Sequence, residues 1–186
     1  MRVIAGRERG RRLLCPAGLR VRPTADRVKE ALFNILQGRI PGARVLDLFA
    51  GTGALGIEAL SRGASYAVFV DNHPASLAAI RANLNQCRFS AEAQVIRSDA
   101  VAFLGRSVHP AGPYDLIFAD PPYRRGFAGI LLEKITPSVL AVDGILTLEH
   151  ARDEGVPERA GAMVRVRCER YGDTALSFYR LERNLA

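Results

Sequence analysis

The sequence of 186 residues predicts an α/β fold in which helices cover both faces of an open, mostly parallel sheet. Two observations support this prediction. From residue 44 onward, short apolar runs alternate with segments of helical periodicity, which is the pattern of βαβ units. Near the C-terminus, two runs of alternating hydrophobicity flank "YGD", which is typical of an antiparallel hairpin added to the sheet.

The first 40 residues are expected to form a small unit of their own, made of a hairpin and a helix. Apolar runs at 2–5 and 12–15 flank "GRERGR", which predicts a basic β-hairpin. The segment "RPTADRVKEALFNILQG" predicts a helix from its apolar period, with Thr24 as candidate N-cap and Gly38 as closing residue. Residues 41–186 are expected to form the main domain.

The main domain is expected to contain seven strands, five in the alternating part and two in the C-terminal hairpin. Strands are predicted where short apolar runs end at turn residues: 44–50, 66–71, 93–99, 114–120 and 144–150, with the hairpin within 162–183. Helices are predicted between the strands, at 54–63, 74–87, 100–106 and 127–135. Gly63 can close the first of these helices, and Pro74 suits the first position of the second.

The net charge of +7 is concentrated at the N-terminal end. Residues 1–44 carry 11 basic and 3 acidic side chains, whereas the other 142 residues are nearly neutral. Of the 26 basic residues 24 are arginine, whose planar fork suits bidentate phosphate contact. A GC-rich genome would also favour arginine, but it does not explain the concentration. We expect RNA phosphate contacts from Arg7, Arg9, Arg11, Arg12, Arg20 and Arg22.

Several classes of protein are disfavoured. No apolar run approaches the roughly 18 to 20 residues that a membrane-spanning helix needs, and charges interrupt the N-terminus where a signal peptide is apolar. We therefore expect a cytoplasmic protein. The three cysteines are odd in number and widely spaced, which argues against a disulfide framework and against a zinc site, and no other metal site is expected.

A glycine-rich loop follows the first strand of the main domain. In "DLFAGTGALG", Gly51, Gly53 and Gly56 fit the dinucleotide-binding pattern, and Asp71 follows Gly51 by 20 residues. However, Asp47 lies four residues before Gly51, where a carboxylate would repel a pyrophosphate. A cofactor with an ammonium and a sulfonium group would tolerate it, so the sequence favours S-adenosylmethionine.

Four acidic residues are expected to meet at one edge of the sheet. Asp47, Asp71, Asp99 and Asp120 lie within or at the end of the first four strands, and ligands of such sheets bind outside the carboxyl ends, here between strands one and four. Asp71 could accept hydrogen bonds from both ribose hydroxyls, and Asp99 from the adenine amine. Any one of these acids could simply cap a loop, but the coincidence of four favours a cofactor site.

The sequence "DPPY", residues 120–123, ends the fourth strand and predicts a site for an exocyclic amine. Such an amine becomes a nucleophile when its hydrogens are held out of the ring plane, and the Asp120 carboxylate and the Pro121 carbonyl could accept them. Tyr123 offers a stacking face worth roughly 1–3 kcal/mol. Pro121 and Pro122 would form a rigid mount. Asp-Pro and Pro-Tyr are also common in loops. Here, however, the turn ends the strand that follows Asp99, the acid expected to contact the adenine.

Together, "DLFAGTGALG" and "DPPY" resemble the class I S-adenosylmethionine-dependent methyltransferases that modify exocyclic or amide nitrogens. "MRVIAGRERGRRL" followed by "RPTADRVKEALFNIL" resembles the bacterial 16S ribosomal RNA guanine-N2 methyltransferases of the RsmD type, over nearly the whole chain. The resemblance implies a seven-stranded Rossmann-like core and methylation of guanine 966, in ribosomal numbering, on the assembling small subunit. We expect a monomer.

The resemblance also implies site residues. For the cofactor they are Asp47, Phe49, Ala50, Gly51, Thr52, Gly53, Asp71, Asn72, Asp99, Ala100 and Asp120. For the target base they are Asp120, Pro121, Pro122 and Tyr123, with Arg124 and Arg125 flanking the pocket mouth. Many relatives have phenylalanine where this chain has Tyr123. His73 is left out of the site, because an aspartate is often found at its place.

Three alternatives remain open at the level of sequence. A DNA adenine methyltransferase usually carries a separate recognition region, for which this chain has no room, and a protein glutamine amide methyltransferase usually has asparagine in place of Asp120. A non-catalytic RNA-binding assembly factor could keep the fold without the activity. A dehydrogenase could use the same glycine pattern, and titration with each cofactor would distinguish it.

Overall fold

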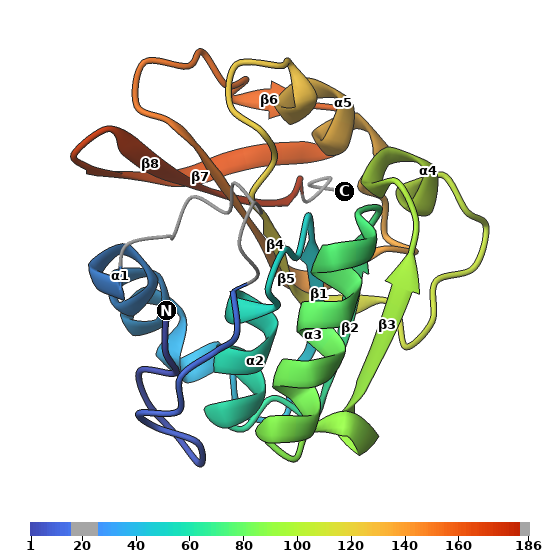
Figure 1. Cartoon of the computed structure of the whole chain (residues 1–186). Helices are drawn as coiled ribbons and strands as arrows, with labels where there is room; N and C mark the ends of the chain where they lie inside the picture. The colour runs from blue at the N-terminus through green and yellow to red at the C-terminus, as the bar shows by residue number, and fades with distance from the viewer. Residues whose placement is uncertain (16–25, 183–186) are drawn as a thin grey trace.

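The computed structural model describes residues 1–15 and 26–182, which form one eight-stranded sheet with helices on both faces (Figure 1). The strand order is β3-β2-β1-β4-β5-β8-β7-β6. The first five strands run parallel, and the last three are antiparallel. Their bounds are β1 Arg44–Leu48, β2 Tyr66–Asp71, β3 Ala93–Arg97, β4 Tyr114–Ala119, β5 Leu140–Ala151, β6 Arg159–Ala160, β7 Met163–Tyr171 and β8 Thr174–Leu181.

The predicted fold class is confirmed, and the strands differ from prediction in detail. The described residues contain eight strands and not seven, because the two-residue β6 pairs with the start of β7 and gives no apolar run of its own. β5 begins at Leu140, four residues before the predicted start. β1 ends at Leu48 because Phe49 adopts a left-handed backbone with φ of 56°, which no strand can continue.

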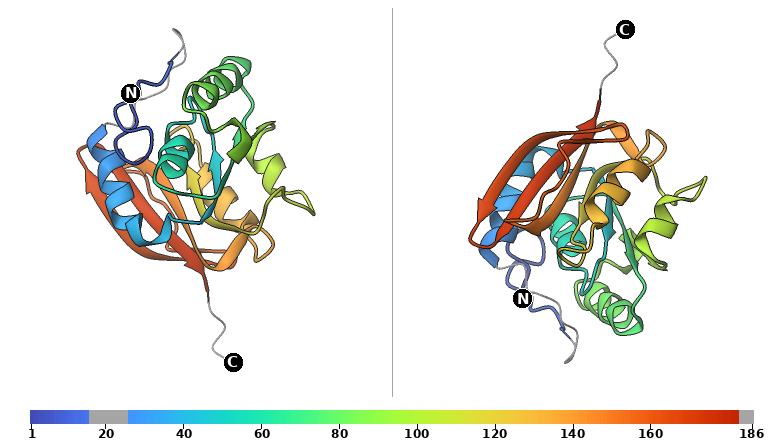
Figure 2. Two further views of the ribbon diagram at one scale, coloured as in Figure 1. Left: turned by 90° about the horizontal axis from the view of Figure 1, so that it is seen from below. Right: turned by 90° about the horizontal axis from the view of Figure 1, so that it is seen from above.

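The helices cover the two faces of the sheet in separate groups, as Figure 2 shows from two sides. Buried residues of α1, α2 and α3 pack on one face, and those of α4 and α5 pack on the other. Their bounds are α1 Asp26–Leu36, α2 Ala54–Ser61, α3 Pro74–Gln86, α4 Ala100–Leu104 and α5 Phe127–Lys134, with short 3-10 turns at Gln37–Arg39 and Ser90–Glu92. No helix in these described parts of the chain is long and apolar enough to cross a membrane.

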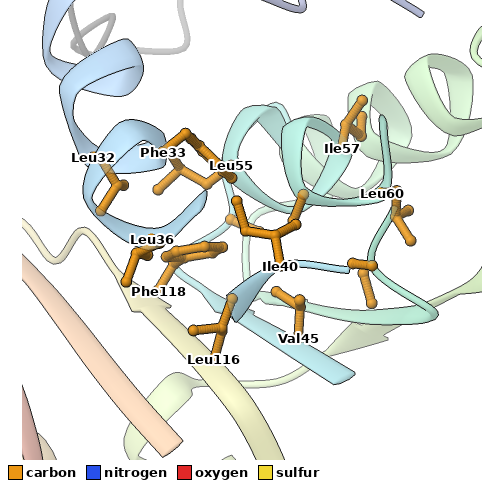
Figure 3. Close-up of a cluster of buried hydrophobic side chains, with 14 of the residues drawn as sticks. Leu32, Phe33, Leu36, Ile40, Val45, Leu55, Ile57, Leu60, Leu116 and Phe118 are labelled. Atoms are coloured by element: carbon orange, nitrogen blue, oxygen red, sulfur yellow. The ribbon is translucent and has the colours of Figure 1, made fainter. Parts of the chain in front are cut away.

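The apolar side of α1 packs directly on the centre of the sheet (Figure 3). Phe33 of α1 contacts Phe118 of β4 with 5.5 Å between the ring centroids, and Leu36 lies beside them. Each fully buried side chain of this size contributes roughly 1.5–3 kcal/mol. The contact therefore holds α1 firmly against the strand that leads into "DPPY".

The N-terminal segment forms a tight hairpin with a single antiparallel bridge, between Arg2 and Arg12. The amide of Val3 donates to the carbonyl of Arg11 at 2.9 Å, so the predicted pairing is present although no regular strand forms. Val3 is buried in the same core as α1 and α2. The predicted N-cap Thr24 lies outside the described residues, and the division of the chain at residue 40 stays a prediction.

Gly56 allows α2 to lie close to β2. A Cβ at this position would overlap the ring of Phe69 and come within 3.2 Å of the Asp47 carboxylate. Gly56→Ala is therefore expected to lower the free energy of unfolding by about 1–3 kcal/mol through overpacking, measured by urea denaturation. Gly129→Ala in α5 is the control, because its Cβ would meet only Pro157 at 4.0 Å. Equal stability of the two variants would contradict this packing.

Candidate active site

A cavity of about 450 Å³ opens at the carboxyl ends of β1 to β4. It lies at the switch point of the sheet, because β1 pairs with β2 on one side and with β4 on the other, as predicted. Its walls are formed by residues at or after the ends of these strands: Phe49, Gly51, Val70, Asp71, Asn72, Ser76, Ser98, Asp99, Ala100, Asp120, Pro121, Pro122 and Tyr123. All of these except Val70, Ser76 and Ser98 are residues that the sequence predicts for the cofactor or the base.

The loop after β1 is held in a conformation that requires glycine. Gly51 and Gly53 have φ of 55° and 78°, in the region that side chains disfavour. The Gly51 amide donates to Oδ2 of Asp71 at 2.9 Å, and the Gly53 amide donates to the Ala50 carbonyl at 2.7 Å. The loop therefore turns beneath the cavity and is fixed to the end of β2.

Asp47 does not line the cavity. Its side chain is buried beneath the glycine loop, where Oδ2 accepts a hydrogen bond from the Gly56 amide at 2.9 Å. Burial raises the pKa of this carboxyl to about 8, against the opposing effect of the Gly56 hydrogen bond. Three other residues expected at the cofactor are absent from the cavity wall: Ala50, Thr52 and Gly53.

The raised pKa of Asp47 predicts a pH-dependent effect of Asp47→Asn. The folded pKa of about 8 lies above the unfolded value of roughly 3.9, so folding favours the protonated form. Relative to the asparagine variant, the wild type should lose stability as the pH rises from 4 to 8. Urea denaturation of both proteins at pH 5 and pH 8 measures this difference. A variant that is no more stable, relative to wild type, at pH 8 than at pH 5 would contradict a buried, protonated Asp47.

Asp71 and Asp99 have structural contacts and also line the cavity. The two carboxylate oxygens of Asp71 accept from the amides of Gly51 and His73, at 2.9 and 2.8 Å, and each oxygen keeps a second lone pair. Asp99 caps α4 by accepting from the Ala102 amide at 3.0 Å. Both acids can therefore accept further hydrogen bonds from a nucleoside. The ring of His73 caps α3 by accepting from the Ala75 amide at 3.3 Å, and its omission from the site stays a prediction.

The "DPPY" turn forms the wall of the cavity next to β4. Pro121 is buried and Tyr123 is half-buried. The Tyr123 hydroxyl donates to Oε1 of Glu149 at 2.8 Å and lies 3.4 Å from the Thr174 hydroxyl. Burial raises the pKa of Tyr123 well above its usual range, and the Glu149 charge adds to this effect. The tyrosine is thus neutral and its ring is fixed in place.

Glu149 is a buried acid that the sequence did not point to. It lies in β5, which pairs with β8, and the Tyr123 hydroxyl contacts both Glu149 and Thr174 of these two strands. The residue is 6% exposed. In the sequence it is one polar residue within "TLEHA", 26 residues after Tyr123, and no spacing rule connects the two.

The predicted RNA-binding arginines differ in their surroundings. Arg7 pairs with Glu92 at 2.5 Å, Arg11 pairs with Glu8 at 2.8 Å, and Arg124 pairs with Asp153 at 2.7 Å. An open cleft of about 530 Å³ is lined by the turn of the hairpin: Arg7, Glu8, Arg9, Gly10, Arg11 and Arg12, with Gln86. Arg125 is exposed, and Arg20 and Arg22 lie outside the described residues.

The cavity suits a cationic nucleoside. Asp71, Asp99 and Asp120 place carboxylates around it, and Phe49 and Val70 supply apolar surface. Carboxylates are good acceptors for ribose hydroxyls, an exocyclic amine and an ammonium group. The volume of about 450 Å³ lies within the usual range for ligand pockets. These residues fit S-adenosylmethionine, and the negative charge of the three carboxylates would disfavour a pyrophosphate.

Comparison with other proteins gives matches over nearly the whole chain. The sequence model of the family described as conserved hypothetical protein 95 matches residues 1–180. The chain is 41% identical to "Putative rRNA methyltransferase YlbH" of Bacillus subtilis over 181 residues, which cover 97% of this chain and 98% of that protein. It is 37% identical to "Ribosomal RNA small subunit methyltransferase D" of Escherichia coli over 158 residues, which cover 84% and 78%.

Solved structures show the same fold. The chain is similar to "Putative methyltransferase yhhF from Escherichia coli", with a TM-score of 0.86 and 33% identity over 99% of both chains. A more distant neighbour, "SMU.776, a putative methyltransferase complexed with SAH", has a TM-score of 0.67 and 17% identity, over 82% of this chain and 49% of that one. The second match supports the fold alone, which is that of class I methyltransferases.

Proposed function

We propose that the protein is a ribosomal RNA methyltransferase, because the chain belongs to the family described as conserved hypothetical protein 95, which includes the RsmD-type enzymes. Its cofactor is S-adenosylmethionine. The proposed reaction moves a methyl group to the exocyclic N2 of a guanine in small-subunit RNA. Guanine 966 of 16S ribosomal RNA is the expected target, by family resemblance.

One observation carries the proposed chemistry: the "DPPY" turn and the acids of a nucleoside site line the same cavity. Asp71 and Asp99 are proposed to hold the ribose and the adenine. Asp120 lines the cavity together with these two acids and with the rest of the "DPPY" turn. Its carboxylate would therefore accept a hydrogen bond from the cofactor or from the target amine. When bound, S-adenosylmethionine supplies an electrophilic methyl group on its sulfonium.

The residues of the turn are proposed to prepare the amine. The lone pair of N2 is delocalised into the guanine ring, and hydrogen bonds from its hydrogens to the Asp120 carboxylate and the Pro121 carbonyl would localise it on nitrogen. The Tyr123 ring, which Glu149 holds in place, would stack on the base. Fixing the base in this position is mainly an orientation effect. The methylated amine is acidic and can lose its proton to water, so no further base is needed.

The choice of N2 can be tested with a substrate that lacks only this amine. Small subunits are reconstituted with 16S RNA that carries either guanine or inosine at the target position, and transfer of labelled methyl is measured. We expect methylation of the guanine subunits and none above background at the inosine position. Equal labelling of both would exclude N2 as the acceptor.

A further inference from the structure

A second cleft, of about 690 Å³, adjoins the cofactor cavity. The two share Tyr123, which lines both of them. The rest of the second cleft comes from the "DPPY" side, from the end of β5 and the residues after it, from β7 and from the β7–β8 turn: Arg124, Ala151, Arg152, Asp153, Arg170 and Asp173. A base that stacks on Tyr123 would therefore have this polar cleft directly beside it.

The arginines of this cleft are not equivalent. The guanidinium of Arg124 is bound by both carboxylate oxygens of Asp153, at 3.0 and 2.7 Å. Arg152 and Arg170 are exposed, and neither forms an ion pair within the parts of the chain that the structure describes. These two arginines thus carry the positive charge that is available to a ligand, and Asp173 is the other acid of the cleft wall besides Asp153.

The positions of both arginines are fixed by the sheet. The Arg152 amide donates to the Asp173 carbonyl at 2.8 Å, which holds the end of β5 against the β7–β8 turn. Arg170 pairs with Ala175 across the β7–β8 hairpin. Both backbones are therefore preorganised beside Tyr123, and only side-chain freedom is lost when a ligand binds.

The backbone turns at Arg124, directly after the "DPPY" residues. Its φ is 58°, in the left-handed region that a non-glycine residue rarely adopts. This conformation places Arg124 on the wall of the second cleft, where its side chain pairs with Asp153.

We propose that this second cleft binds the RNA backbone next to the target nucleotide, with Arg152 and Arg170 as ligands of its phosphates. The inference rests on the proposed function. An arginine fork matches a phosphate in geometry and in charge, and phosphate contacts fix the position of the nucleic acid while the pocket acts on the base. The cleft is distinct from the basic N-terminal hairpin, so the RNA has a contact surface on the "DPPY" side of the sheet as well.

The test compares Arg152→Ala, Arg170→Ala and the double variant with Arg180→Ala. Arg180 is an exposed arginine of β8 that lies outside the cleft. Arg180→Ala is therefore the control, because it removes one positive charge, as each of the other single variants does. KM for small ribosomal subunits is measured by methyl transfer, and binding to a 16S RNA fragment is measured between 50 and 200 mM salt. For the double variant we expect KM to rise by about tenfold or more. We also expect the salt slope of binding to fall by roughly 0.7 for each phosphate that the variant no longer binds.

Two further readouts separate this inference from the proposed function. Binding of S-adenosylhomocysteine should be unchanged in all variants, because the cofactor cavity contains neither arginine. If wild type methylates the subunit but the double variant has the same KM and salt slope as Arg180→Ala, the cleft is not an RNA site. If wild type neither binds nor methylates RNA, the proposed function and this inference both fail.

Discussion

Replacing Asp120 with alanine is expected to reduce methyl transfer by about 10²-fold or more, since it removes the acceptor that we propose for the reacting amine. Asp120 follows β4 and lines the cofactor cavity beside Pro121 and Tyr123. Affinity for S-adenosylhomocysteine should fall by no more than about tenfold, because Asp71, Asp99 and the glycine loop remain. Single-turnover methyl transfer and equilibrium titration with S-adenosylhomocysteine measure the two quantities separately.

Asp120→Asn is the matched control, because it keeps the shape of the side chain and one acceptor oxygen, while an NH2 donor replaces the other oxygen and the charge is lost. Its activity should lie between that of wild type and that of the alanine variant. Full activity of Asp120→Ala would remove Asp120 from the mechanism. Loss of cofactor binding in parallel with activity would instead assign it to the cofactor alone.

Replacing Glu58 with alanine should have the largest effect on stability, about 3–5 kcal/mol, because it leaves a buried charge without its partner. Glu58 lies in α2 with its side chain fully buried, 3.3 Å from the ammonium of Lys29, which is 1% exposed. Its oxygens also accept from the amides of Ile4 and Ala5 and from Arg62. Burial already lowers the pKa of Lys29, and loss of the nearby carboxylate would lower it further. Urea denaturation measures the change.

The double variant Lys29→Met with Glu58→Leu separates the cost of an unpaired Lys29 charge from the cost of the other hydrogen bonds that Glu58 accepts. If the cost of Glu58→Ala comes from the uncompensated ammonium, removing both charges should recover most of the lost stability. Recovery will be incomplete, because the amides of Ile4 and Ala5 and the guanidinium of Arg62 still lose their acceptor. A double variant as unstable as Glu58→Ala would show that these other hydrogen bonds of Glu58 dominate.

The parts of the fold that are predictable from sequence have strong local signals. The inner strands β1, β2 and β4 are mostly apolar runs between turns, as expected for strands buried on both faces, whereas the edge strand β3 is partly exposed. The position of β4 beside β1 then places "DPPY" next to the glycine loop. The cavity follows from these two facts, and for this reason Asp71, Asp99 and Asp120 line it together as predicted.

The parts that are not predictable depend on the direction of side chains and on contacts between distant elements. Asp47 is predicted at the cofactor, but its side chain points beneath the loop to Gly56. Glu149 meets Tyr123 only because β5 lies beside β4 and β8. Lys29 resembles any polar residue of an amphipathic helix, yet it is buried against Glu58. A linear sequence gives no spacing rule for such pairs.

The transfer of a methyl group to guanine N2 in small-subunit RNA is tested most directly with labelled S-adenosylmethionine and four substrates. These are small ribosomal subunits, free 16S RNA, DNA and a protein extract, and the modified nucleoside is identified by mass. We expect N2-methylguanosine in the RNA of the small subunit. Label in DNA or protein, or another methylated nucleoside in the RNA, would contradict the proposed reaction.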